Sequence, residues 1–525
     1  MEPMRIEAYP LQFIIYPRDR QDIELIRLWC KNFIRVNTYW DKRRKQKVSI
    51  PVAAYVFFSK DRSNIRAMRT MLPDFIAHLN LARKIEGKDF VVEEKSLDIK
   101  LAENKYPEVL DHIKPRGEQG DLIEFITKNH NGCYLMALFT GGGKSLSSIM
   151  ICQKLKQRMV CIMRPGYHGE QTEDSISGWI KEFAKSTKVD PKDICTVSGN
   201  KELKSIINLA LAGELHYKVI LISNKTLQYY VKYYEDYSEE EFKDLGFNAT
   251  PMELGKVLGV DTVFVDEVHQ DSHFQCKLIT YLGVNKMVGA TGTIKASDPF
   301  VNKMAAYAYP IKNRYMQKNI EPHVQPTAFH FKFDKPFMIR SDGFRGYNHI
   351  NFEKSILKRK GLTKQYFGMI DNLVYDRFLT RLPLDPEYKC LIVVASINMA
   401  RALAAYLKEC YPDLEVNSFV EDDPDSNAFN STICVSTHQS SGTGLDIPKL
   451  AAVFMTVAIG SEQTNIQVQG RLRKLPLEGA LHDFVYFVCD DIDSHRKYHY
   501  DKRDRIFKGK LLPVIELDSG IVLEV

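Results

Sequence analysis

The residues that most clearly carry chemistry form a glycine-rich turn within LFTGGGKSLSSIM, positions 138–150. An apolar segment ends at this turn, three glycines follow, and Lys144 and Ser145 open a helical pattern. Glycines let backbone N–H groups curl around a phosphate without a side-chain clash, and a helix N-terminus adds the positive end of its dipole. We expect Lys144 to reach the β- and γ-phosphates of a nucleotide and Ser145 to ligate Mg²⁺.

The cradle around the phosphates would be completed by Thr140, Gly141, Gly142 and Gly143. The strict pattern GxxxxGK[ST] fails at its first position, which is Leu138. A purely structural turn is therefore the alternative interpretation of this segment taken alone.

A second segment, VFVDEVHQ at 263–270, is an apolar strand that ends in two acids. Asp266 is placed to hold Mg²⁺, and Glu267 is placed to orient or deprotonate an attacking water. An Asp-Glu pair at a strand end is usually a solvated turn. Here the pair follows a predicted phosphate loop by about the length of one domain, and this order along the chain favours a catalytic site.

These two segments resemble the Walker A and DExH-box Walker B motifs of superfamily 2 helicases. Further segments resemble the remaining motifs of that family, in the same order along the chain. Arg116 and Gln119 resemble the R-x-x-Q element that reads adenine. The segment at 163–183, with Arg164 and a trailing W-x-x-E-F, resembles motif Ia, and ISNKTL at 222–227, with Ser223 and Asn224, resembles the next motif that contacts nucleic acid.

The second half of the motif series continues the resemblance. GATGT at 289–293 resembles motif III, which implies that Thr291 and Thr293, together with His269, couple hydrolysis to movement. CLIVVASINMARALAAYL resembles motif IV and its helix, with Ser396 as a nucleic-acid contact. STHQSSGTGLDIP at 436–448 resembles motif V, with Gly444 and Asp446 near the ribose and Ser436 or Thr437 near the strand backbone.

QVQGRLRK at 467–474 resembles motif VI. The resemblance implies that Gln467 contacts the nucleotide and that Arg471 and Arg473 neutralise charge building on the γ-phosphate. The common pattern Q-x-x-G-R-x-x-R would put Lys474 in place of the last arginine. The shorter pattern Q-x-x-G-R-x-R of the Dicer and RIG-I-like branch fits without substitution, so which arginine is the finger stays open.

The resemblance implies a motor that hydrolyses ATP with Mg²⁺ while it grips nucleic acid largely independently of sequence. A small domain ahead of the motor, the total length and the W-x-x-E-F trailer are similar to phage UvsW-type DNA helicases. Those resemble RecG in remodelling forks and Holliday junctions during replication, recombination or repair. This narrower resemblance implies a monomeric DNA helicase, with DNA as partner and a phage origin with action in the host cytoplasm.

Four alternatives stay open on the sequence. An RNA or double-stranded RNA helicase is favoured by the form of motif VI. A translocase subunit of a larger assembly would share the motor. A nucleic-acid-binding scaffold with an inactive ATPase is a third alternative, although Lys144, Asp266, Glu267 and Arg471 are all present. A small-molecule kinase would share the phosphate loop alone.

The elements that must position these residues alternate between short apolar runs and helical stretches from about residue 106 onward. Such alternation indicates parallel sheets with helices on both faces. A second series starts after about 310, and two series indicate two lobes. We predict an α/β fold of two tandem RecA-like lobes, preceded by a small α+β domain. The predicted boundaries are 1–105 for the N-terminal accessory domain, 106–305 for lobe one, 306–480 for lobe two, and 481–525 for a strand and a basic helical tail.

Within the first 105 residues we expect strands at LQFIIYP and at NTYW paired with VSIPVAAYVFFS, and a helix at IELIRLWCKNFIR. A second helix is expected over NIRAMRTMLPDFIAHLNLARK, broken or kinked at Pro73. A basic hairpin tip at residues 40–47, with Trp40, and the basic segment at 495–510 are candidate contacts for nucleic acid. A solvated charged face is the alternative for each.

Composition limits the class of protein. With 525 residues the chain is too long for one core, and a formal charge of +6 is compatible with a polyanionic partner. The ten cysteines include no CxxC pair, which favours buried free thiols of a reducing compartment over disulfides or a zinc site. We see no signal peptide and no apolar run long enough to cross a membrane, so we expect a soluble cytoplasmic protein.

Overall fold

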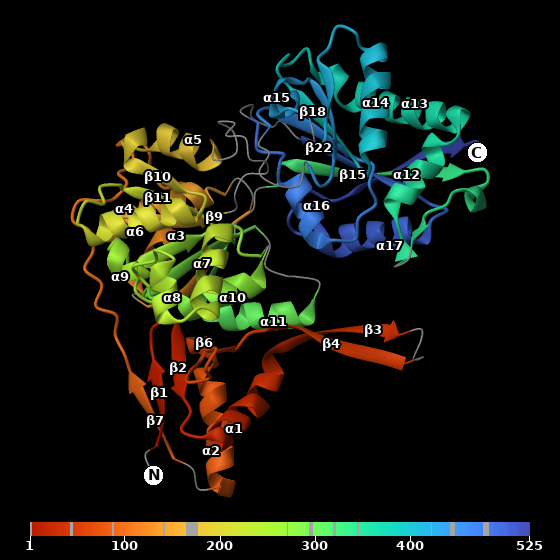
Figure 1. Ribbon diagram of the computed structural model, residues 1–525. Helices are drawn as coiled ribbons and strands as arrows, with labels where there is room; N and C mark the ends of the chain where they lie inside the picture. Colours follow the sequence, from red (N-terminus) through yellow and green to blue (C-terminus); the bar gives the residue numbers. More distant parts are fainter. Residues whose placement is uncertain are drawn as a thin grey trace. The chain divides into compact units, whose positions relative to one another are not determined.

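The computed structural model describes residues 3–41, 46–86, 89–129, 131–139, 142–163, 177–269, 271–292, 298–318, 322–343, 346–421, 423–440, 447–475 and 482–525 (Figure 1). The chain divides into two units, Met1–Gln317 and Lys318–Val525. Each unit is described by itself.

The first unit begins with a five-stranded mixed sheet of order β5-β6-β2-β1-β7, with β1 antiparallel to β2 and parallel to β7. A separate two-stranded antiparallel sheet, β3–β4, carries the hairpin. The elements are β1 (Met4–Ala8), β2 (Gln12–Tyr16), α1 (Arg20–Cys30), β3 (Ile34–Asp41), β4 (Gln46–Ala54), β5 (Phe57–Phe58), β6 (Ile65–Met68), α2 (Leu72–Glu86) and β7 (Phe90–Glu94). This is the α+β domain expected from the sequence.

One element of this domain differs from the expectation. The segment predicted as a single helix broken at Pro73 is strand β6 followed by α2, which starts at Leu72. Pro73 therefore lies in the first turn of α2, where the missing N–H has no intrahelical partner to lose. The proline starts this helix and does not kink it.

Lobe one follows as a seven-stranded parallel sheet, within the described residues, of order β10-β11-β9-β12-β13-β8-β14. Helices cover both faces (Figure 1). The elements are α3 (Gln119–Lys128), β8 (Gly132–Ala137), α4 (Lys144–Leu155), β9 (Met159–Met163), α5 (Ser177–Ser186), β10 (Ile194–Val197), α6 (Asn200–Leu211), β11 (Val219–Ser223), α7 (Asn224–Asp236), α8 (Glu239–Asp244), α9 (Leu254–Leu258), β12 (Thr262–Val265), α10 (Ser272–Tyr281), β13 (Lys286–Thr291), α11 (Pro299–Ala308) and β14 (Arg314–Met316).

Side chains alternate across this sheet between two separate apolar clusters. In β12, Val263 and Val265 join one cluster and Phe264 joins the other. Successive strand residues point to opposite faces, so a strand with both faces covered is apolar throughout. This is why the strands of lobe one appear in the sequence as continuous apolar runs.

The N-terminal domain shares its core with lobe one. A single apolar cluster runs from Ile6 and Trp29 through to Leu278 and Met304. Polar contacts reinforce the join: Arg35 lies 2.7 Å from Asp298, and the Thr70 hydroxyl donates to the Tyr307 carbonyl at 2.6 Å. The described elements of the N-terminal domain are thus packed against lobe one within the first unit.

Lobe two is a second seven-stranded parallel sheet, within the described residues, of order β19-β20-β18-β21-β22-β15-β23. Two apolar clusters fill its faces. The elements are β15 (Val324–Phe333), β16 (Asp342–Gly343), β17 (Gly346–Tyr347), α12 (His349–Leu357), α13 (Lys360–Arg377), β18 (Lys389–Val394), α14 (Ile397–Cys410), β19 (Val416–Phe419), α15 (Asp425–Asn430), β20 (Ile433–Thr437), β21 (Leu450–Met455), α16 (Glu462–Gln469), β22 (His482–Cys489), α17 (Asp493–Asp501) and β23 (Ile515–Leu523).

Short helical turns complete the described chain: η1 (Lys31–Phe33), η2 (Arg69–Met71), η3 (Pro191–Asp193), η4 (Ile311–Asn313), η5 (Pro336–Met338), η6 (Leu379–Arg381) and the π-helical turn η7 (Lys502–Ile506). The predicted fold class, two tandem RecA-like α/β lobes after a small α+β domain, is confirmed.

The ends of the lobes lie later in the chain than the predicted boundaries. Strand β14 pairs with β8, so lobe one extends past residue 305. Residues 481–525 do not form a tail, because β22 lies between β21 and β15 and β23 pairs with β15. Every residue of β22 is buried, as a central parallel strand requires.

The ten cysteines are free thiols, and all except Cys195 and Cys410 are buried. Among the described residues, no helix has both the length and the apolar character needed to cross a membrane.

Candidate nucleotide-binding site

The phosphate loop joins β8 to α4 at the carboxyl edge of the lobe-one sheet. Gly142 donates its N–H to the Phe139 carbonyl at 2.9 Å, and Gly143 directly precedes α4 with φ of +78°. A Cβ at Gly143 would overlap the side-chain amide of Gln119. Glycine is therefore required at 143 both by the left-handed backbone and by this close approach. Thr140 and Gly141 lie outside the described residues.

Gln119 connects the predicted adenine-reading element to the phosphate loop. Its buried side chain accepts from the Arg116 N–H at 2.8 Å and donates to the Gly143 carbonyl at 3.4 Å. Arg116 itself is exposed. The contact shows that Gln119 positions the start of α4, and its role toward adenine stays a prediction.

The two acids follow β12 directly, and Lys144 faces the second of them. The Lys144 Nζ lies 3.5 Å from Glu267 Oε1, and the Lys144 side chain is largely buried. Strands β8 and β12 are separated by β13 alone in the parallel sheet, so their carboxyl ends bring these segments to one edge. The sequence placed Lys144 and Glu267 in one site, and the fold brings them together.

Asp266 is held by two hydrogen bonds. Its Oδ2 accepts from the indole N–H of Trp179 at 3.2 Å, and its Oδ1 accepts from the Glu267 N–H at 3.0 Å. Burial and then the neighbouring charge of Glu267 raise the pKa of Asp266, while Lys144 and Trp179 act in the opposite direction. Carboxylate and hydroxyl oxygens suit Mg²⁺, so Asp266 and Ser145, which is half-buried in the first turn of α4, fit the predicted ligand set.

Trp179 is a site residue whose role the sequence did not reveal. It lies on α5, packs beside Phe183 in the core, and reaches an acid 87 positions away. The available signal was the W-x-x-E-F segment itself. It identified a motif but not the partner of the indole N–H.

Glu267 has an unusual backbone conformation, with φ of +49°. A non-glycine residue in this region costs free energy and persists where its surroundings impose it. His269 Nδ1 lies 3.2 Å from Glu267 Oε2 and 2.7 Å from the Thr291 hydroxyl. The predicted coupling residues His269 and Thr291 therefore form a chain of contacts to the proposed catalytic acid, and Thr293 lies outside the described residues.

Ser223 ends β11 and Asn224 begins α7, at the same carboxyl edge of the lobe-one sheet. The Ser223 side chain is buried. Arg164, the other predicted nucleic-acid contact of lobe one, lies outside the described residues.

In lobe two, Ser396 caps α14 by accepting the Met399 N–H at 3.3 Å. Ser436 is buried and donates to the Phe419 carbonyl at 2.7 Å, whereas Thr437 stands at the end of β20 and contacts Ser440 at 3.0 Å. Both hydroxyls are buried and have partners within lobe two, so the role of Ser436 or Thr437 toward nucleic acid stays a prediction.

The motif VI residues lie on and after α16, where Gln467 is in the last turn. Arg471 is buried, with 8% of its surface exposed, and Arg473 is exposed. Gly444 and Asp446 lie outside the described residues. The predicted basic tip at 40–47 also falls there in part, since residues 42–45 and the side chain of Trp40 are not described.

No protein-family profile matches the chain, and no curated protein matches its sequence. Among solved structures the chain is similar to the Pyrococcus furiosus Hef helicase domain, with a TM-score of 0.42 and 13% identity over 74% of this chain and 98% of that one. It is also similar to Mss116p bound to ssRNA and AMP-PNP, with a TM-score of 0.46 and 14% identity over 75% of this chain and 72% of the other. For Mycobacterium smegmatis Lhr bound to ssDNA and AMP-PNP, the TM-score is 0.44 and the identity 14%, over 76% of this chain and 49% of that helicase.

Proposed function

We propose that the chain is an ATP-driven nucleic-acid motor of the superfamily 2 helicase type, acting on DNA and remodelling branched structures. The observation that carries the ATPase part is the group formed by Lys144, Asp266 and Glu267 at the carboxyl edge of one parallel sheet. A lysine at a glycine-bounded helix N-terminus facing a pair of acids is the arrangement that phosphoryl transfer from a nucleotide requires.

Each residue has a distinct proposed task. Lys144 binds the β- and γ-phosphates, and Gly142 and Gly143 leave room for the phosphates beside the backbone. Glu267 accepts a proton from the attacking water. Asp266 and Ser145 hold Mg²⁺, which when bound neutralises charge on the phosphates. Arg471 or Arg473 stabilises charge on the γ-phosphate as it leaves.

The proposed path from hydrolysis to movement runs through His269. His269 contacts Glu267 on one side and Thr291 on the other. A change in the position or charge of Glu267 would therefore alter the contacts of Thr291 at the end of β13. Motif residues at the carboxyl edges of both lobes, such as Ser223, Asn224, Ser396 and Thr437, are the proposed contacts to the strand backbone. Contacts made to phosphates would make binding largely independent of sequence and sensitive to salt.

The assignment to branched DNA rests on the resemblance in sequence and on the extra N-terminal domain. Its hairpin β3–β4 forms a sheet of its own and does not pair with the five-stranded sheet. We propose this hairpin as the element that recognises branched or duplex DNA. Because residues 1–105 share a core with lobe one, shortening the hairpin between Asn37 and Ile50 is a cleaner change than deleting the domain.

The deciding experiment measures ATP hydrolysis by purified protein with no polymer, single-stranded DNA, a DNA fork, a Holliday junction or RNA. Lys144→Ala should abolish hydrolysis, and Lys154→Ala, an exposed lysine on the same helix, should leave it unchanged. We expect the largest stimulation with branched DNA, and we expect the shortened hairpin to lose that preference while keeping stimulation by single strands.

Other outcomes redirect or refute the proposal. Stimulation by RNA alone would keep the motor and replace its substrate, in agreement with the form of motif VI given by Gln467, Gly470, Arg471 and Arg473. Hydrolysis that no polymer stimulates would refute the motor and favour a nucleotide-binding scaffold or another phosphotransfer enzyme. Equal losses on all DNAs after the hairpin is shortened would refute its role in recognising branches.

A further inference from the structure

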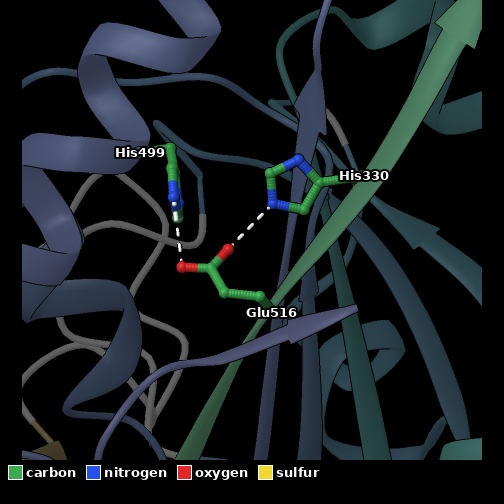
Figure 2. A group of neighbouring side chains, drawn as sticks. All are labelled: His330, His499 and Glu516. Atoms are coloured by element: carbon green, nitrogen blue, oxygen red, sulfur yellow. Dashed lines mark hydrogen bonds and ion pairs between the residues drawn. The ribbon is translucent and has the colours of Figure 1, made fainter. Parts of the chain in front are cut away.

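Lobe two holds a group of three side chains with no task in the proposed motor (Figure 2). His330 comes from β15, His499 from α17 and Glu516 from the edge strand β23. Their nearest ligand atoms all lie within 4.8 Å of one another. His330 Nε2 is 2.9 Å from Glu516 Oε2, and His499 Nε2 is 3.3 Å from Glu516 Oε1. Two imidazole nitrogens thus converge on one carboxylate.

The far side of each imidazole is also fixed by a hydrogen bond. His330 Nδ1 lies 2.8 Å from Asp490 Oδ1, and His499 Nδ1 lies 2.9 Å from the Tyr486 hydroxyl. Histidines that ligate metals usually use their second nitrogen in this way, because the outer partner fixes the ring and its tautomer. Both rings therefore direct Nε2 toward the same carboxylate, each to a different oxygen.

The separations suit a small tetrahedral ion. With metal–ligand bonds of about 2.0–2.2 Å, neighbouring tetrahedral ligands lie about 3.3–3.5 Å apart. The 2.9 and 3.3 Å separations run to the two oxygens of the Glu516 carboxylate, and one ligand atom from each residue lies within 4.8 Å of the others, so side-chain rotation has to bring the three ligands to this spacing. The histidine side chains are 17% and 3% exposed, whereas Glu516 is 43% exposed, so an ion can enter from the side of the carboxylate.

We propose that His330, His499 and Glu516 form a binding site for one zinc-class divalent ion, with water as the fourth ligand. Two nitrogens and one carboxylate favour Zn²⁺ over Mg²⁺ or Ca²⁺, which select oxygen ligands. Bound Zn²⁺ joins β15, α17 and β23 and so fixes the last strand of the sheet. The ion stabilises lobe two and takes no part in hydrolysis at Lys144.

Nearby charges shape the strength of the site. Arg503 Nη1 lies 3.5 Å from Glu516 Oε1 and competes with the ion for that carboxylate. Arg503 also pairs with Asp504 at 2.8 Å, which gives the guanidinium a partner when Glu516 turns to the metal. Asp490, hydrogen-bonded to His330, adds negative charge behind the first ligand.

The test uses full-length protein stripped with a chelator and transferred to chelator-free buffer. Titration with Zn²⁺ alone should give one high-affinity equivalent per chain by calorimetry and by metal analysis after gel filtration. Glu516→Gln and His330→Gln should each weaken this binding at least tenfold, and Asp490→Asn should weaken it by about 10–100-fold as an outer-partner change does. Glu524→Gln, the same substitution in the same terminal segment but outside the cluster, should bind as the wild type does.

Two further readouts keep the proposal open to refutation if a variant folds poorly. In the wild type, Zn²⁺ should slow hydrogen exchange in β23 and raise the melting temperature. Lys144→Ala should bind Zn²⁺ unchanged, which separates this site from the failure or success of the motor proposal. Each of three results would overturn the site. They are binding of less than one equivalent of Zn²⁺ per chain by the wild type, binding by the cluster variants as tight as that of Glu524→Gln, and hydrogen exchange in β23 that stays unchanged on addition of Zn²⁺. In those cases the three side chains are an ion-pair cluster only.

Discussion

At the scale of single residues, Asp266 shows how much the site depends on one distant donor. Its carboxylate is destabilised by burial and by Glu267, and the indole N–H of Trp179 is among the groups that favour its charged form. Mg²⁺ binds the charged form. On the proposed function, Trp179 is therefore a positioning residue that acts on the nucleotide through Asp266.

Trp179→Phe removes this N–H and keeps an aromatic ring in the core. Hydrogen bonds to charged groups contribute about 1.5–3 kcal/mol, so losing this one disfavours the charged carboxylate. We expect the pKa of Asp266 to rise further, so the acidic limb of the ATPase pH profile should move to higher pH. Steady-state hydrolysis measured across pH at varied MgATP tests this expectation.

The matched control for that experiment is Trp29→Phe. Trp29 is buried in the N-terminal domain, and its indole N–H has no hydrogen-bond partner among the described residues. The control should lower stability without moving the pH profile. A profile that moves equally in both variants, or in neither, would contradict a positioning role for Trp179.

At the scale of elements, strands β12 and β13 run side by side; the predicted coupling residue His269 follows β12, and Thr291 ends β13. Val263 pairs in register with Met287, and Val265 pairs with Gly289, so the residues after β12 approach the end of β13. The Val268 N–H donates to the Ala290 carbonyl at 3.1 Å, which ties the two ends together. On the proposed function, this link lets a movement after β12 reach the end of β13.

Thr291→Val keeps the shape of this buried residue and removes the hydroxyl that contacts His269. On the proposed function, basal ATP hydrolysis should change little, while stimulation by DNA and strand separation should fall about tenfold, as expected for one lost hydrogen bond of about 1.4 kcal/mol. Basal and stimulated rates measured side by side test this. The control is Thr280→Val, which removes a buried hydroxyl hydrogen-bonded within α10. Equal losses of stimulated hydrolysis in both variants would mean that Thr291→Val acts through packing and not through the contact with His269.

A buried lysine joins another pair of elements. Lys286, at the start of β13, is 1% exposed and donates to the Ile126 carbonyl in the last turn of α3 at 3.0 Å. Burial lowers the pKa of Lys286 to about 8. The unfolded value is about 10.4, so the unfolded chain holds more protons between these pH values and this group's contribution to stability rises with pH across that window.

Lys286→Met should abolish the part of the pH dependence of stability that comes from the titration of this lysine. The free energy of unfolding of the wild type, relative to the variant, should increase from pH 8 to pH 10 by up to about 1.4 kcal/mol per pH unit. Urea unfolding of both proteins at several pH values gives the difference. Lys312→Met, an exposed position in the same lobe, should show no such trend, and a flat difference for Lys286→Met would contradict the buried-cation account.

At the scale of the molecule, the N-terminal domain and lobe one share one apolar core. Aromatic contacts cross between them: Phe33 with Tyr307, Tyr55 with Phe300, and Phe57 with Tyr281. Lobe two has separate apolar clusters of its own. The first unit should therefore unfold as a whole.

Deletion of residues 1–95 should destabilise lobe one, because it removes more than a third of the residues of the shared core and exposes Phe300 and Tyr281. We expect a lower melting temperature for the first unit, binding of a hydrophobic dye and loss of soluble protein. Calorimetry of the full chain and of the 96–525 fragment checks this. A fragment with an unchanged first transition would show that the domain is dispensable for stability.

Short patterns along the chain were enough to predict the class of fold and to name candidate site residues. These patterns are short-range, because a loop conformation or a buried strand is encoded by adjacent residues. They are the glycines before Lys144, the acids after an apolar strand, and the alternation of apolar runs with helices. The same patterns failed for Pro73, where a helix start and a helix break look alike in sequence. They also failed for residues 481–525, whose strands join a sheet that began at Val324.

Only the tertiary structure decided which distant side chains meet. The contact of Trp179 with Asp266, the chain from Glu267 through His269 to Thr291, and the group of His330, His499 and Glu516 all depend on strand order. In a parallel sheet that order is set by long crossovers, and neighbours in space are far apart in sequence. A single sequence therefore names the reactive residues, while the packing of the sheet selects their partners.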